Sequence, residues 1–121
     1  MRYMLMFKTV DDAEPGVPPC KDDLPEMAKL IEEGKRTGVI LSTEGLHPSW
    51  TGTRVAYAGG KLAVMDGPFA EAKEVVAGFA IVDVPTKEVA VEWAKKFLAV
   101  AGQGESEIRP IFEAGEVPTK G

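Results

Sequence analysis

The chain has 121 residues, of which 45% are hydrophobic and 27% are charged, the balance of an ordinary soluble domain. Its length suits one domain over residues 1–121, and its single cysteine excludes an intramolecular disulfide. The formal net charge of -5 argues against direct nucleic-acid binding or an anionic membrane surface, because lysine and arginine make those contacts. No apolar run is long enough to span a bilayer, and the first residues lack the features of a secretory signal, so a cytoplasmic protein is expected.

The first third of the chain predicts two strands around a helix. The apolar and aromatic run Tyr3 to Lys8 predicts a strand that is buried on both faces. Thr9 to Asp23 is rich in proline and aspartate and predicts a long loop, which is either functional or plainly mobile. Leu24 to Thr37 has apolar residues at helical spacing, with Asp23 as a candidate N-cap. The β-branched run Val39 to Thr43 predicts the second strand.

The middle of the chain predicts a hairpin followed by another strand. Thr53 to Ala58 and Lys61 to Met65 are strand-like runs that flank Gly59-Gly60, a typical hairpin turn. Val76 to Val84 predicts the next strand, in which Gly78 indicates a bulge or a close backbone approach.

The last third predicts a helix and a final strand. Thr86 is a candidate N-cap for a helix whose apolar residues recur at i, i+4 spacing, with Trp93 facing the core. Glu105 to Phe112 predicts the last strand, with Pro110 at an edge or near its end. Residues from Glu113 onward form a polar tail that is expected to be loosely held.

The order of these elements predicts an α+β fold of the ferredoxin-like type, βαβ(ββ)βαβ. Its antiparallel sheet is covered on one face by two helices, and the hairpin is added in the middle. The other face of the sheet would leave apolar side chains in water. A homodimer through the open sheet face would cover them, because large exposed apolar patches are unfavourable.

One stretch, Asp66-Gly67-Pro68-Phe69-Ala70-Glu71-Ala72-Lys73-Glu74, predicts a rigid polar turn between two apolar runs. With the Asp-Val-Pro-Thr step into the second helix, it resembles the YCII-related family, in its DGPF-domain branch. The resemblance extends from Met1 to Ile111 and implies a ferredoxin-like, dimeric α+β barrel fold. Smaller YCII-like proteins pair an aspartate with a histidine near the start of the first helix. Residues 23–27 contain no histidine here, so that catalytic dyad is not carried over.

Two groups of polar residues follow predicted strand ends, where a cleft can open. His47, the only histidine, and Asp66 are the candidate acid–base pair, because histidine titrates near neutral pH. Glu44, Lys73 and Arg54 are candidate substrate-binding residues, the two cations as anchors for an anionic group. Plain structural roles remain open: a solvated His47, an Asp66 that holds the turn, and a surface Lys73. Arg109 is either a further anion clamp or an ion-pair residue.

Two functions follow from these residues. The first is a small acid–base enzyme, of the isomerase or lactone/enol type, acting on a small organic acid in a strand-end cleft. The alternative is a non-catalytic metabolite-binding or regulatory module, because DGPF-branch proteins resemble companions of extracytoplasmic-function sigma factors. No cofactor motif is present, and one histidine with one cysteine cannot build a structural zinc site. An oxygen-ligand metal site of Glu44, Asp66 and Glu71 is conceivable but has no specific support, so no metal is expected.

Overall fold

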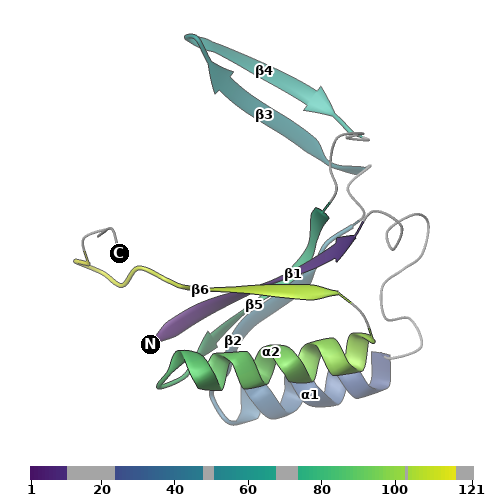
Figure 1. The fold of residues 1–121 in the computed structure, drawn as a ribbon, viewed down its shortest axis with the longest axis vertical. Coiled ribbons are helices and arrows are strands. Elements are labelled where there is room, and N and C mark those ends of the chain that lie inside the picture. Colours follow the sequence, from purple (N-terminus) through teal and green to yellow (C-terminus); the bar gives the residue numbers. More distant parts are fainter. Residues whose placement is uncertain (11–23, 48–50, 68–73, 103, 117–121) are drawn as a thin grey trace.

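The computed structural model of the chain describes residues 1–10, 24–47, 51–67, 74–102 and 104–116. It confirms the predicted α+β class, with two helices packed on an antiparallel sheet (Figure 1). In chain order the elements are β1 (Arg2–Val10), α1 (Leu24–Arg36), β2 (Ile40–Gly45), β3 (Thr53–Ala58), β4 (Lys61–Asp66), β5 (Glu74–Asp83), α2 (Lys87–Ala101) and β6 (Glu105–Pro110).

The main sheet has four strands in the order β2-β5-β1-β6, and every neighbouring pair is antiparallel. The two strands that follow the helices, β2 and β6, therefore form the edges, and β5 and β1 form the centre. Both helices lie on the same face of this sheet (Figure 1). This is the ferredoxin-like arrangement that the element order predicts.

The core lies between the sheet and the helices. Leu5 of β1 and Val82 of β5, the two central strands, are fully buried. α2 contributes Trp93, which is 7% exposed and confirms its predicted core position, and Phe97, whose ring centroid lies 5.0 Å from that of Phe7. Thr86 caps α2 as predicted, because its side-chain oxygen accepts a hydrogen bond from the Val89 backbone N–H.

The prediction that β1 is buried on both faces was wrong. Tyr3 and Leu5 are buried against the helices, whereas the alternate residues Met4 and Met6 are only half-buried. Successive side chains of a strand point to opposite faces, and the helices cover one face only. The residues of this apolar run therefore belong alternately to two surfaces, the core and the open sheet face.

The element bounds differ from the predicted ones because strand pairing, rather than composition, decides where a strand ends. β1 extends to Val10, where it pairs with Glu74 of β5. β2 begins at Ile40 and extends to Gly45, which lies opposite Gly78. β6 ends at Pro110, before the predicted Phe112. The candidate N-cap Asp23 and most of the predicted loop, residues 11–23, lie outside the described residues.

Gly78 confirms the prediction of a bulge and of a close backbone approach. The β1–β5 register shifts between Phe7 and Lys8, beside Gly78. A Cβ atom at Gly78 would lie 2.7 Å from the Glu44 carbonyl oxygen, which is closer than real Cβ contacts. Glycine at this position therefore allows β2 to pair closely with β5.

The β3–β4 hairpin forms a two-stranded sheet of its own. It lies on the side of the main sheet opposite the helices (Figure 1). All six residues of β3 and all six of β4 are exposed. The hairpin therefore contributes no residue to the core and projects from the domain as an arm.

Candidate functional site

The base of the hairpin holds Asp66 in a defined position. Asp66 is the last residue of β4 and lies opposite Thr53, the first residue of β3. The Thr53 hydroxyl donates a 2.7 Å hydrogen bond to Oδ1 of Asp66. Next to this pair, the Gly67 backbone N–H donates to the Gly52 carbonyl at 2.9 Å. The carboxylate is exposed, and these bonds hold it at the end of a strand.

This geometry refines the prediction that Asp66 begins the turn. Asp66 belongs to the strand, and its hydrogen-bond donor lies 13 residues earlier in the chain. The carboxylate is therefore fixed by cross-strand register rather than by a local turn bond. One Asp66 oxygen remains available in addition to the one that Thr53 occupies, because a carboxylate has two acceptor oxygens.

Glu44 and His47 lie where β2 leaves the main sheet. Glu44 is exposed and lies opposite Phe79 of β5. The Leu46 backbone N–H donates to the Ala77 carbonyl at 2.8 Å, so pairing with β5 continues beyond β2. This pairing brings the exposed His47 to the end of the sheet at which β5 begins. Within the described ranges, no hydrogen bond or ion pair joins His47 to Asp66.

Arg54 is exposed on β3 and lies opposite Met65. Since neighbouring residues of a strand alternate between faces, Arg54 lies on the hairpin face opposite that of Asp66. Lys73, like Glu71, lies outside the described residues. The described candidates thus occupy two places: Glu44 and His47 at the end of β2, and Asp66 and Arg54 at the base of the hairpin.

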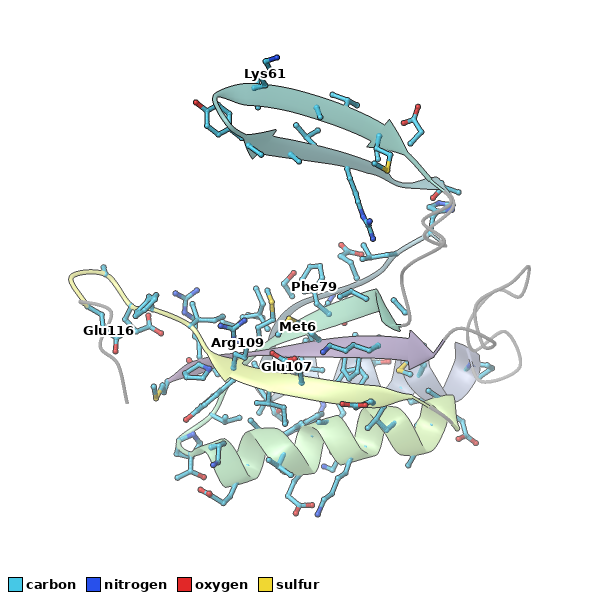
Figure 2. All side chains as sticks on the ribbon, turned by 45° about the horizontal axis from the view of Figure 1, so that its top comes forward. Met6, Lys61, Phe79, Glu107, Arg109 and Glu116 are labelled. Atoms are coloured by element: carbon cyan, nitrogen blue, oxygen red, sulfur yellow. The ribbon has the colours of Figure 1, made fainter. Side chains whose placement is uncertain are left out.

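Sequence reasoning missed a charged cluster on the open sheet face. Lys8 Nζ lies 2.7 Å from Glu107 Oε1, and Arg109 Nε lies 3.9 Å from Glu107 Oε2. The hydrogen bond from Lys8 and the positive charges of Lys8 and Arg109 lower the pKa of Glu107. Figure 2 shows Glu107 and Arg109 beside Met6 and Phe79, on the side of the sheet away from α2. The alternating charges of β6 are the sequence signal, but their partner Lys8 is 99 residues away.

A shallow hollow lies elsewhere, on the outer side of α1. It is lined by Ala28, Ile31, Glu32, Lys35 and Arg36. None of the predicted site residues lines it. Its charges are of both signs, and it lies on the helical side of the domain, apart from the hairpin.

No group of three or more histidine, cysteine, aspartate or glutamate side chains that could hold a metal ion occurs in the described parts of the chain. Glu71, one member of the conceivable oxygen-ligand set, is not among them. Neither described helix combines the length and apolar character needed to cross a membrane.

Two comparisons connect the chain to known proteins. The YCII-related domain matches residues 1–114, which include every described helix and strand. An uncharacterized protein of Rhizobium meliloti (strain 1021) is 33% identical over 94 residues, which cover 75% of this chain and 73% of that protein. The chain therefore belongs to the YCII-related family.

Proposed function

We propose that this protein acts as a homodimer, joined through the open sheet face, that binds a small organic acid at the base of the β3–β4 hairpin. The observation that carries the dimer is an apolar group on the face that the helices leave open. We name it the sheet quartet: Met4, Met6, Phe79 and Ile81. All four are half-buried, and none is part of the core or packed against it. Apolar surface on an open sheet face is typical of an interface.

The ligand site is proposed at the hairpin base because Asp66 is already positioned there. The Asp66 carboxylate can accept a hydrogen bond from a hydroxyl or enol group of the ligand. The hydrogen bond from Thr53 fixes the orientation of this carboxylate. Lys73 would supply positive charge for the ligand's carboxylate, and Glu44 would line the site, whereas Arg54 lies on the opposite hairpin face and is left out of the proposed site. The string Asp66-Gly67-Pro68-Phe69 supports placing the chain in the DGPF-domain branch, which is a finer assignment than the family itself.

A binding role is favoured over catalysis because the two acid–base candidates are both exposed. Acid–base catalysis needs the two groups within reach of one substrate, and catalytic sites gain most of their electrostatic effect by excluding water. The catalytic alternative, in which Asp66 and His47 act as base and acid, is favoured by chain topology. β2 leads toward the hairpin from the sheet end at which His47 lies.

A thermal-shift screen with a panel of hydroxy, keto and enol carboxylic acids tests the binding role. A ligand at roughly 100 times its Kd adds about 2.7 kcal/mol to the free energy of unfolding, which raises Tm by several degrees. We expect Asp66→Asn to abolish that shift, whereas Lys95→Gln, a change on the exposed side of α2, retains it. Failure of every acid in the panel to raise Tm would overturn the binding proposal.

The catalytic alternative is separated from binding by turnover. If an acid that binds is also converted, with a pH–rate profile that Asp66→Asn and His47→Gln both change, the protein is an enzyme. If it binds the acid unchanged, the binding role stands. A regulatory role linked to a sigma factor would be supported by a sigma-factor gene beside that of this protein.

A further inference from the structure

One face of the hairpin is apolar, and nothing in the described chain buries it. The β3–β4 register places Val55 opposite Val64 and Tyr57 opposite Leu62. Directly opposed residues share a face, so all four point to the same side, and we name them the hairpin quartet. They are 66%, 69%, 72% and 71% exposed, respectively. The alternate residues, on the other face, include the small Ala56 and Ala63.

A hairpin with such a face needs a cover. An isolated two-stranded hairpin is marginally stable in water, and here no described hairpin residue is buried. Four large apolar side chains at this exposure form a patch on the order of 300–600 Å², the size of the largest apolar patch on a typical monomer, which is often functional.

The sheet quartet has the same layout as the hairpin quartet. Met4 lies opposite Ile81, and Met6 lies opposite Phe79, so it also consists of two cross-strand pairs on neighbouring antiparallel strands. In both quartets the strands are about 4.8 Å apart, and consecutive pairs on one face are separated by about 6.8 Å. Met6 and Phe79 point to the side of the sheet on which the hairpin lies (Figure 2). The two apolar surfaces therefore share the same arrangement of two cross-strand pairs.

We infer that the hairpin quartet of one protomer packs on the sheet quartet of a second copy of the chain. This inference rests on the proposed homodimer and names the segment that covers the open sheet face. In a two-fold dimer the hairpin of each chain packs on the sheet of the other chain. The contact therefore forms twice, and the assembly is a closed dimer. Two hairpin patches and two sheet patches together approach the roughly 1,600 Å² of a standard protein interface.

Charge supports the same pairing. Asp66 shares the hairpin face with the quartet, because it lies opposite Thr53 at the same side of the hairpin. Arg109 shares the sheet face with the sheet quartet, because it lies opposite Met4. The Arg109 side chain is 69% exposed, and its ion pair with Glu107 is long, at 3.9 Å. Docking brings the Asp66 carboxylate onto the face that carries Arg109 of the partner subunit, so the binding site contains residues of both chains.

Charge substitutions on the two faces of β4 test the contact. Val64→Asp puts a carboxylate into the apolar contact, and we expect the dimer Kd, measured by sedimentation equilibrium, to rise roughly 30-fold or more. Ala63→Asp is the matched control, with the same charge on the same strand but on the other hairpin face, and should leave Kd within about threefold. Both variants should keep the parent far-UV circular dichroism, because neither residue is buried within the chain.

Engineered disulfides identify the chain that the hairpin contacts. In a Cys20→Ser background, a chain carrying Leu62→Cys is mixed with a size-tagged chain carrying Met6→Cys and oxidised. We expect a disulfide between the two different chains. If a chain that carries both cysteines instead closes on itself as a monomer, the hairpin covers its own sheet and the inference is overturned.

The two proposals fail in different ways. If Met6→Asp dissociates the dimer but Val64→Asp does not, and no disulfide forms between the mixed chains, the sheet-face dimer stands and the hairpin contact is overturned. If the parent chain is a monomer throughout the measured concentration range, both are overturned.

Discussion

At the scale of single residues, the charged cluster on the open sheet face makes the free energy of unfolding depend on pH. Lys8 and Arg109 hold the pKa of Glu107 below its ordinary value in the folded chain. A carboxylate whose pKa is lowered by folding adds stability above its unfolded pKa, which is about 4.3. That contribution is lost as the pH falls through the lower folded pKa. The free energy of unfolding should therefore decrease as the pH drops below about 4.3.

Lys8→Met tests this coupling. We expect the Glu107 pKa, followed by NMR of its side-chain carboxyl carbon, to return toward the ordinary glutamate value. Lys95→Met is the control, because Lys95 pairs with Glu92 on an exposed helix surface, apart from the sheet. An unchanged Glu107 titration in Lys8→Met would show that the 2.7 Å hydrogen bond does not set this pKa.

The candidate residues were named from the sequence, but their partners were not. Asp66 stands out because it begins the Asp-Gly-Pro-Phe string, whereas the role of Thr53 depends on the hairpin register. Glu107 looks like an ordinary surface charge until β6 is placed beside β1. Local patterns identify residue types and turns. Contacts between strands that are distant in the chain depend on pairing, which no local pattern contains.

At the scale of elements, the helices were the most predictable part of the chain. α2 has a polar N-cap at Thr86, a continuous apolar stripe and Gly102 in the left-handed conformation at its end, and all three signals are local. The strands were identified correctly, but their faces were not, as β1 shows. The separation of the hairpin from the main sheet also required long-range information, because its alternating sequence suits either arrangement.

The close pairing of β2 with β5 at Gly78 gives a prediction at this scale. Gly78→Ala would press a methyl group against the Glu44 carbonyl, and we expect it to lower the free energy of unfolding by about 1–3 kcal/mol. Gly45→Ala is the matched control, since Gly45 lies opposite Gly78 and a Cβ there meets no atom within 4 Å. Urea denaturation measures both. Equal free energies of unfolding for the two variants would mean that β2 can move away from β5 to make room for the methyl group without loss of stability.

At the scale of the whole molecule, the core and the proposed dimer contact use different segments. The core is built from β1, β2, β5 and the two helices, and no hairpin residue belongs to it. Replacing residues 53–66 with a short Gly-Ser turn should therefore leave a folded monomer. The replacement is geometrically simple, because Gly52 and Gly67 are joined by a 2.9 Å hydrogen bond.

For this shortened chain we expect parent-like helical circular dichroism together with loss of the dimer in sedimentation equilibrium. Met6→Asp provides the reference, a full-length chain made monomeric at the sheet instead of at the hairpin. Its free energy of unfolding should be close to that of the shortened chain. A shortened chain that does not fold would show that the hairpin supports the domain from within.

The exposed hairpin also has an evolutionary consequence. Residues in a core are constrained by their own chain, but the hairpin quartet has no such neighbours in the described structure. Selection on Val55, Tyr57, Leu62 and Val64 would then act through the surface that covers them. Among descendants of one ancestor, changes in these four positions should accompany changes in the sheet quartet. Two diverged copies in one cell would in this way cease to pair with each other while each kept the same fold.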